Sequence, residues 1–420
     1  MTRSIDCLVI GAGPAGLAAS GALVERGVDH VVLERGQAGQ TWRTQRWDSL
    51  RLNNPGWMNS MLGKQPRNTY LSTAEVVARL TRLGSVAPIH EHTPVVTVVR
   101  RGDAWIVRTA DTEFRTRAVV VATGGENVPL VPRLARLLPD RTAQCHAASY
   151  RAPDQLPDGA VLVVGSAQSG YQISEELLRA GRRVYLATSP VGRAPARHRG
   201  RDTVEWLVEC GFFDQYPDDL PDRSVISAPQ PLIAPGGRSA SLQALARSGA
   251  ILLGRLVNVG GDRMMFASDL VDSIATADAY AARIRAVLDE AIARAGLSAP
   301  PVEVDEADAP VHLDPPTQLQ FREHDITSVV WCTGYAGDFS WLDPTLTDHH
   351  GQPLRHGAAA LVPGLWYLGL RWLIRRSSGN FLGFPADAAI VGDAVAATLR
   401  NGRRLGTNQV SLVTFGTAPP

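Results

Sequence analysis

The sequence predicts an α/β fold in which one domain is inserted into another. Two glycine-rich turns, GAGPAG at residues 11–16 and GSAQSG at residues 165–170, each follow a short apolar stretch and precede a helical pattern. The segments around the two turns align with each other without a gap. This order of strand, turn, helix and strand is the plan of a Rossmann-like βαβ unit, so we expect two dinucleotide-binding domains.

Length and composition agree with this fold class. The chain has 420 residues, of which 45% are hydrophobic and 20% charged, which suffices for two packed domains. A net charge of +1 gives no field that favours nucleic acid or a membrane surface as a partner. The apolar stretch 358–374 contains Pro363 and Arg371 and is too short to span a bilayer. We therefore expect a cytoplasmic protein.

The four cysteines are far apart in the sequence. They are Cys7, Cys145, Cys210 and Cys332, and no CxxC pair occurs. This spacing favours neither a zinc site nor a redox-active dithiol, so we expect no metal.

The internal repeat has a constant offset of 154 residues. Gly165 falls opposite Gly11, Gly170 opposite Gly16, and Gly181 opposite Gly27. A second pair of similar segments is AVVVATGG at 118–125 and SVVWCTGY at 328–335. Each segment is predicted to be a strand that ends in Thr-Gly, and its valine content is typical of a buried parallel sheet.

The remaining elements follow from periodicity and turn residues. The proline-rich, acidic segment 298–316 is expected to be a linker or domain edge. We expect a first unit over residues 1 to about 35, irregular structure over 36–68, a helix over 73–83, strands over 95–100, 104–109 and 119–124, a second unit from about residue 160, an amphipathic helix over 279–295, and a final strand and helix over 365–370 and 386–399.

The first glycine turn has the chemistry of a dinucleotide site. Gly11 permits the tight turn, Gly13 lets a pyrophosphate approach the backbone, and Gly16 lets the helix pack against the strand. The helix N-terminus offers free N–H groups to the phosphates. Glu34 ends the next strand, where a carboxylate binds a ribose hydroxyl.

The second turn differs in two ways. Thr188 stands opposite Glu34 and is followed by Ser189, Arg193, Arg197, Arg199 and Arg201. A missing acid beside arginines suits a 2′-phosphate, which predicts NADP rather than NAD, although the arginines could also be a solvated surface run. Ala167 adds a methyl group where glycine is usual, which is tolerable if the dinucleotide lies slightly farther from the backbone or binds only transiently. Together the two turns suggest FAD that is reduced by NADPH.

These motifs resemble those of the flavin-containing monooxygenases, a family that includes the YUCCA-type and Baeyer–Villiger enzymes. The similarity lies in GAGPAG at 11–16, QTWRTQRWDSLRLNNP at 40–55, ATGG at 122–125, GSAQSGYQISEEL at 165–177, WCTGYAGDFSWL at 331–342 and GLWYLGLRWLIRRSSGNFLGFPADA at 364–388. The resemblance implies a FAD domain at 1–155 and 301–420, with an NADPH domain inserted at 156–300.

The resemblance also assigns residues. For cofactor binding it implies Gly11, Gly13, Pro14, Ala15, Gly16, Glu34, Arg35, Gln40, Thr41, Trp42, Asn53, Val96, Ala122, Thr123, Gly124, Gly165, Ser166, Gln168, Ser169, Gly170, Ser189, Arg193, Gly334 and Leu382. Asn53 is also the candidate catalytic residue beside the flavin. The alternative interpretation of Asn53-Asn54-Pro55 is a simple turn.

One family motif is only half present. In FxGxxxHxxxY, His146 and Tyr150 match, whereas Asp140 and Thr142 replace the Phe and Gly. This departure speaks against a Baeyer–Villiger enzyme, and His146 alone is more often a structural hydrogen-bonding residue.

The implied function is an NADPH-dependent monooxygenase. Its partners would be O₂ and a small molecule, oxygenated at nitrogen, sulfur or an activated carbon through a C4a-peroxyflavin. Three alternatives stay open: an NADPH-dependent flavin reductase or oxidase, a disulfide reductase, which the missing CxxC opposes, and a FAD-binding sensor without catalysis. Neither the substrate nor the oligomeric state follows from these motifs.

Overall fold

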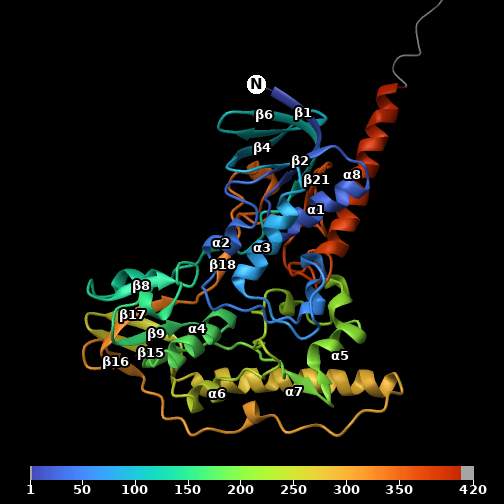
Figure 1. Ribbon diagram of the computed structural model, residues 1–420. Helices are drawn as coiled ribbons and strands as arrows, with labels where there is room; N and C mark the ends of the chain where they lie inside the picture. Colours follow the sequence, from blue (N-terminus) through green and yellow to red (C-terminus); the bar gives the residue numbers. More distant parts are fainter. Residues whose placement is uncertain (1, 408–420) are drawn as a thin grey trace, which may run out of the picture. The chain divides into compact units, whose positions relative to one another are not determined.

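A computed structural model of the chain describes residues 2–407 (Figure 1). It contains two compact units, each assembled from separate stretches of the chain. Unit 1 comprises residues 1–40, 80–125 and 337–420, and unit 2 comprises residues 41–79 and 126–336.

Unit 1 is built on a mainly parallel sheet. Its central order is β21-β6-β1-β2-β3, and an antiparallel hairpin, β4 and β5, extends from β6. The strands are β1 (Thr2–Ile10), β2 (His30–Leu33), β3 (Ile89–His90), β4 (Val95–Arg101), β5 (Ala104–Thr109), β6 (Glu113–Val121), β19 (Arg355–His356), β20 (Ala359–Ala360) and β21 (Leu365–Tyr367). Helices α1 (Pro14–Glu25) and α8 (Phe384–Thr407) pack against each other beside this sheet (Figure 1). Helices α2 (Gln40–Thr44) and α3 (Thr73–Gly84) lie at the boundary between the chain segments of the two units.

Unit 2 contains a second parallel sheet, ordered β8-β17-β9-β10-β13. All five residues of its central strand β9 are buried, as expected for a parallel strand covered on both faces. Its strands are β7 (Val128–Pro129), β8 (Ala143–His146), β9 (Ala160–Val164), β10 (Val184–Ala187), β11 (Arg197–His198), β12 (Arg201–Asp202), β13 (Ile251–Leu253), β14 (Leu256–Gly260), β15 (Arg263–Phe266), β16 (Gln318–Gln320), β17 (Ile326–Trp331) and β18 (Tyr335–Ala336). Its helices are α4 (Gln168–Arg179), α5 (Thr203–Glu209), α6 (Leu242–Arg247) and α7 (Leu270–Arg294).

The two sheets confirm the internal repeat. Helices α1 and α4 begin and end at positions 154 residues apart, at Pro14 and Gln168 and at Glu25 and Arg179. Strand β6 pairs in parallel with β1, and β17 pairs in parallel with β9. The similar segments 118–125 and 328–335 therefore occupy equivalent positions in the two sheets. The predicted α/β fold with two Rossmann-like sheets is therefore confirmed.

The units divide the chain at places other than the predicted 155 and 300. The divisions between their larger segments fall between residues 125 and 126 and between residues 336 and 337, and residues 41–79 also belong to unit 2. The reason is that β8 and β17 are strands of the second sheet, in which β17 lies between β8 and β9. The expected flavin segments 126–155 and 301–336 are thus part of unit 2.

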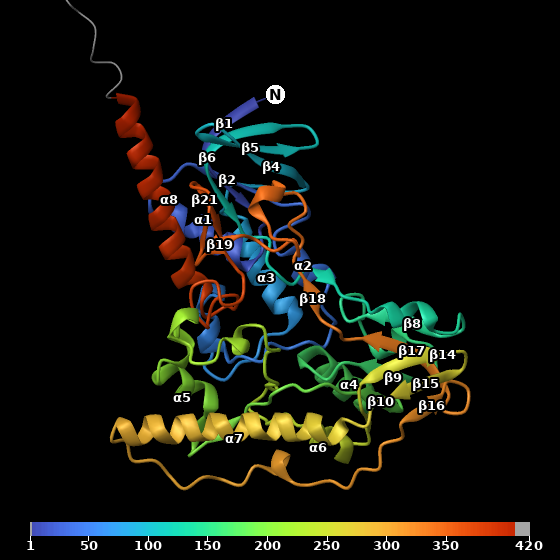
Figure 2. The same ribbon diagram turned by 180° about the vertical axis from the view of Figure 1, so that it is seen from behind.

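Several predicted elements differ in extent. The strand predicted over 119–124 is β6, which begins at Glu113 and ends at Val121. Helix α7 is longer than the predicted 279–295 and begins at Leu270. Segment 298–316 runs beside α7 in an extended form, with one 3-10 turn at Glu306–Asp308 (Figures 1 and 2).

Aromatic side chains of unit 2 contribute to a separate hydrophobic cluster against α7. Trp206 is buried and packs with Ile284, Leu288 and Ile292 of α7, and Phe212 and Phe213 pack against the same cluster.

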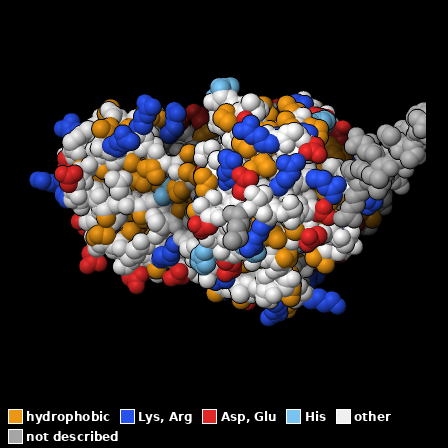
Figure 3. All heavy atoms as spheres, turned by 90° about the horizontal axis from the view of Figure 1, so that it is seen from above, with side chains coloured by type: hydrophobic (Ala, Val, Ile, Leu, Met, Phe, Trp, Pro, Cys, Tyr) orange, Lys and Arg blue, Asp and Glu red, His pale blue; other side chains and the backbone are white. Residues whose placement is uncertain are grey.

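On the face shown in Figure 3, basic and acidic side chains are interspersed, in keeping with the net charge of +1. Within residues 2–407, no helix is long and apolar enough to cross a bilayer.

Candidate dinucleotide-binding sites

The glycine turn of unit 1 requires its first and last glycines for steric reasons. Gly11, directly after β1, has φ +101°, and a Cβ there would lie 2.8 Å from the Ala122 carbonyl oxygen. A Cβ on Gly16 would lie 1.8 Å from the Gly11 carbonyl oxygen. Neither position accepts a side chain, because the turn, helix α1 and the end of β6 are in close contact.

Gly13 is different, because no part of the protein requires it to be glycine. It is the N-cap of α1 with φ −74° and ψ −176°, a conformation open to any residue. A Cβ on Gly13 would meet no protein atom within 4 Å. Pro14 at the first helical position fixes the helix start without using an N–H. This open cradle at a helix N-terminus fits a dinucleotide pyrophosphate that approaches the backbone.

Glu34 lies beside the same cradle. It is 6% exposed, and its carboxylate accepts hydrogen bonds from the Ala12 N–H (2.7 Å) and the Gly36 N–H (2.9 Å). These bonds hold the carboxylate at the carboxyl end of β2, next to the glycine turn. Each oxygen keeps a lone pair with which it can accept a ribose hydroxyl.

Other predicted residues of unit 1 lie at the ends of neighbouring strands. Ala122, Thr123 and Gly124 follow β6, and the Ala122 N–H donates to the Ile10 carbonyl. Val96 is 52% exposed, in β4 where its register with β5 shifts. The structure also places Pro14, Ala15, Arg35, Gln40 and Leu382 in unit 1, whereas Thr41, Trp42 and Asn53 belong to unit 2.

The glycine turn of unit 2 repeats this geometry. Gly165 has φ +105°, and a Cβ there would lie 2.4 Å from the Cys332 carbonyl oxygen. A Cβ on Gly170 would lie 1.8 Å from the Gly165 carbonyl oxygen. Cys332 therefore occupies the place that Ala122 has in unit 1. Ala167 is the N-cap of α4 and aligns with Gly13, with its methyl group in the position that is open in unit 1.

Two predicted ligand residues of this turn bind the protein itself. The Ser166 hydroxyl accepts from the Ser189 N–H (3.0 Å) and donates to the Ser189 carbonyl (3.2 Å). The Gln168 side-chain amide makes two hydrogen bonds to the backbone of Ile233 (2.7 and 3.1 Å). These two side chains position the segments that flank the α4 N-terminus, and the backbone N–H groups of the turn remain for a ligand.

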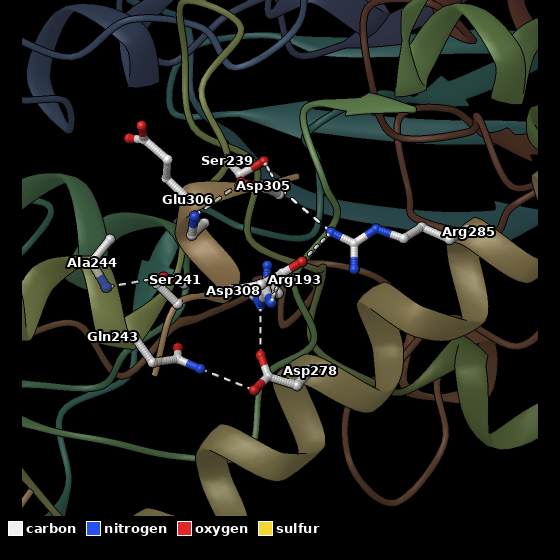
Figure 4. Close-up of polar contacts among 12 residues, drawn as sticks. Arg193, Ser239, Ser241, Gln243, Ala244, Asp278, Arg285, Asp305, Glu306 and Asp308 are labelled. Atoms are coloured by element: carbon white, nitrogen blue, oxygen red, sulfur yellow. Dashed lines mark hydrogen bonds and ion pairs between the residues drawn. The ribbon is translucent and has the colours of Figure 1, made fainter. Parts of the chain in front are cut away.

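Arg193, predicted to contact a 2′-phosphate, is buried beside two aspartates. It is 1% exposed, and its guanidinium donates to Asp278 (2.8 Å) and to Asp308 (Figure 4). Burial alone would lower the pKa of Arg193, but the hydrogen bonds with the two aspartates outweigh it and raise the pKa. Because two carboxylates already neutralise the side chain, the surroundings of Arg193 do not support the predicted contact with a 2′-phosphate.

The other arginines of the same run are engaged as well. Their closest carboxylate contacts are Arg197 with Asp202 (3.0 Å), Arg199 with Asp289 (2.6 Å), and Arg201 with Glu209 (2.6 Å). These ion pairs within unit 2 favour the alternative interpretation, in which the run lies on the surface and is not a phosphate site.

A cation that the sequence reasoning missed lies close to Gly334. The Arg46 guanidinium lies 5.1 Å from the Trp42 ring centroid and 5.8 Å from that of Tyr335. Burial lowers the pKa of Arg46. A single arginine in a loop gives no sequence signal of its own, so only the fold reveals this stack.

His146 and Tyr150 have structural partners. His146 Nε2 lies 3.1 Å from the Gly334 carbonyl, and its Nδ1 accepts from the Ala148 N–H (3.1 Å). The Tyr150 hydroxyl donates to Glu176 of α4 (2.8 Å). The interpretation of His146 as a structural hydrogen-bonding residue fits these contacts.

Asn53 lies in the turn before Pro55 and is partly buried. Leu52, the residue before it, donates its N–H to the Leu71 carbonyl (2.8 Å), which fixes the backbone at this point.

Among the residues that the structure describes, no group of three or more metal-ligating side chains occurs. The four cysteines are free.

Similar proteins are flavin-dependent oxidoreductases. The profile of the family "Pyridine nucleotide-disulphide oxidoreductase" matches residues 8–207, which include both glycine turns. An uncharacterized CzcO-like oxidoreductase of Geobacillus kaustophilus is 28% identical over 397 residues, which cover 92% of this chain and 97% of that protein. The rice (Oryza sativa subsp. japonica) indole-3-pyruvate monooxygenase YUCCA1 is 32% identical over 231 residues, or 53% of this chain and 56% of that protein.

A solved structure shows the same fold. The flavin-containing monooxygenase from Stenotrophomonas maltophilia matches with a TM-score of 0.63 at 22% identity, and the match covers 94% of this chain and 99% of that one. Residues 8–207 of the present chain thus match the profile of the pyridine nucleotide-disulphide oxidoreductase family, and the chain has the fold of that flavin-containing monooxygenase.

Proposed function

We propose that the chain is a FAD-containing, NADPH-dependent monooxygenase. FAD binds at the glycine turn of unit 1 and NADPH at the glycine turn of unit 2. The enzyme oxygenates a small molecule at nitrogen, sulfur or an activated carbon, with O₂ as the second substrate and a C4a adduct of the flavin as the oxygenating species. The names of the relatives support this class of reaction.

One observation carries the proposal: the same loop geometry occurs twice, with different surroundings. Gly11 and Gly165 share a positive φ near 100°, and both turns open onto a helix N-terminus. Only the first turn has a carboxylate, Glu34, at the end of the next strand, where Thr188 stands in the second. A carboxylate suits an unphosphorylated ribose, as in FAD, and its absence suits NADPH.

The protein's own groups would bind and orient both cofactors. The free N–H groups at the starts of α1 and α4 would hold the two pyrophosphates, where the helix dipoles also favour negative charge. When bound, FAD supplies hydride acceptance and oxygen activation.

The start of α8 supports the location of the flavin in unit 1. A Cβ built on Gly369 would lie 2.6 Å from the Ala15 Cβ and 3.9 Å from the Phe384 ring, so the first turn of α8 lies near the glycine turn. We propose that its N-terminus stabilises negative charge on the reduced flavin ring.

The oxidative half of the reaction tests the proposal. FAD-loaded protein is reduced with NADPH without oxygen and then mixed with aerated buffer. An absorbance that belongs to neither oxidised nor reduced flavin and decays slowly, with little early peroxide, supports the monooxygenase. Immediate reoxidation with one peroxide per flavin would instead assign the NADPH-dependent oxidase. A flavin that NADPH does not reduce would assign the non-catalytic sensor.

A further inference from the structure

Arg255 follows β13, the strand at the edge of the sheet next to β10. In this sheet β13 pairs in parallel with β10, and β10 with β9, so their carboxyl ends share one edge. The Thr188 N–H and hydroxyl both contact the Leu253 carbonyl (3.0 and 2.8 Å). Arg255 comes two residues after Leu253 and Ser189 two residues after its partner Ala187, so both follow the carboxyl ends of paired strands. Neighbouring strands are about 4.8 Å apart, so an arginine side chain at this position can reach the end of β10.

The backbone of Arg255 is held firmly. Its N–H donates to Asp269 Oδ1 (2.8 Å), and its carbonyl accepts from the Ala267 N–H (2.9 Å). The preceding Gly254 packs so closely that a Cβ there would lie 1.8 Å from the Ala267 carbonyl oxygen. The chain therefore presents Arg255 from a fixed point, which favours specific recognition by its side chain.

The guanidinium of Arg255 keeps donors that can bind a ligand. Its side chain is 66% exposed, and its one ion pair among the described residues joins Nε to Asp269 Oδ2 at 3.5 Å. In contrast, Arg193 and Arg199 contact their carboxylates at 2.8 and 2.6 Å. A charged guanidinium with uncommitted donors beside a ribose site is the group that recognises a phosphate.

We infer that Arg255 binds the 2′-phosphate of NADPH at the second site and thereby sets the preference for NADPH over NADH. The inference rests on the proposed function, because it needs NADPH to bind along the carboxyl edge of the β9–β10–β13 strands. In that arrangement the adenosine ribose lies at the end of β10, next to Arg255. The missing carboxylate at Thr188 removes the repulsion that a phosphate would otherwise meet.

The test measures nucleotide binding and flavin reduction in four proteins. These are the wild type, Arg255→Ala, Arg255→Lys, and Arg263→Ala as a control that removes an exposed arginine from β15. Calorimetric titration with adenosine 2′,5′-bisphosphate reports on the phosphate site without any catalysis. Anaerobic reduction rates at varied NADPH and NADH give the apparent dissociation constant of each nucleotide.

The inference predicts a selective effect. In Arg255→Ala the bisphosphate and NADPH should bind about 10- to 100-fold more weakly, as for loss of a charge-assisted contact, while NADH changes little. Arg255→Lys should retain part of the preference, and Arg263→Ala all of it. If wild type is reduced by NADPH and Arg255→Ala has the same preference, the inference is wrong and the proposed function stands. If neither nucleotide reduces wild type or binds to it, both are wrong.

Discussion

Ala167 adopts the backbone conformation that Gly13 has in the other glycine turn. The angles are φ −73° and ψ −170° for Ala167 and φ −74° and ψ −176° for Gly13. Because this conformation is open to alanine, the methyl group does not strain the protein. It instead occupies the space that is open beside Gly13, so under the proposed function the two loops should differ in how tightly they hold a dinucleotide.

Replacing Ala167 by glycine should tighten the second site. We expect Ala167→Gly to lower the dissociation constant of NADP⁺ by about tenfold, the effect of one methyl group in a close contact. The measurement is calorimetric titration of the oxidised protein. Ala180→Gly at the C-cap of the same helix is the matched control and should leave the constant unchanged. Equal affinity in wild type and Ala167→Gly would show that the dinucleotide does not approach this position.

The reverse change in unit 1 should weaken FAD binding without unfolding the protein. In Gly13→Ala the new Cβ meets no protein atom within 4 Å, so the far-ultraviolet circular dichroism spectrum should match that of wild type. The purified variant should carry much less FAD per chain, measured by absorbance after heat release. Full FAD content in Gly13→Ala would contradict the assignment of FAD to this turn.

Arg193 should matter for stability rather than for cofactor choice. Figure 4 shows why: its buried guanidinium links α7, through Asp278, to segment 298–316, through Asp308. Arg193→Ala should lower the free energy of unfolding by about 1–3 kcal/mol, because two carboxylates lose their cation. Urea unfolding measures this change. Flavin reduction by NADPH and NADH should keep its wild-type ratio, and a selective loss of NADPH use would restore Arg193 as a phosphate ligand.

The thiols should behave as isolated groups. Burial raises the pKa of Cys7 and Cys332, and it raises that of Cys145 to about 11, whereas Cys210 is exposed. A disulfide reagent should therefore label Cys210 in the native protein and all four thiols in urea. Mass spectrometry of the labelled peptides identifies the sites. The appearance of two further reactive thiols after NADPH treatment would support the disulfide-reductase alternative instead.

Asp387 should make stability depend on pH. This carboxylate in the first turn of α8 is 0% exposed, and Arg375 Nε lies 3.5 Å away. Burial raises its pKa, against the opposing effects of Ser378 and Arg375. The folded state thus binds the proton more tightly than the unfolded state. Stability from this group is present at acid pH and is lost as pH rises from the usual aspartate pKa through the raised one.

Asp387→Asn removes this titration. The variant should melt at a higher temperature than wild type at pH 7, and the difference should shrink toward pH 4. Thermal melts across this range, with Asp393→Asn on the exposed side of α8 as the control, measure the effect. A difference in melting temperature that does not change with pH would show that folding does not raise the pKa of Asp387.

Local sequence patterns predicted the repeated units well. The glycine turns, helix α1 and helix α4 depend on residues that are neighbours in sequence, so the offset of 154 residues carries over directly into the structure. Glu34 was also predictable, because its place at the end of β2 follows from the length of one βαβ unit.

Contacts between distant segments were not predictable in the same way. Strand β17 pairs between β8 and β9, which places both β8 and β17 in unit 2. The unit boundaries therefore differ from the predicted ones, and no local sequence pattern indicates that pairing. Arg193 finds its aspartates 85 and 115 residues away. A run of arginines has the same sequence pattern whether its side chains bind a ligand or pair with carboxylates from distant parts of the chain. Only the fold distinguishes these two cases. Arg46 and Asp387 escaped notice for the same reason, as single charged residues without a motif.

The reductive half of the reaction tests the central claim most directly. FAD-loaded protein is titrated with NADPH under anaerobic conditions while the absorbance of the oxidised flavin is recorded. Two cooperating dinucleotide sites predict complete bleaching at one NADPH per flavin. A flavin that stays oxidised in excess NADPH and in excess NADH would contradict the account, since the second glycine turn would then deliver no hydride to the first.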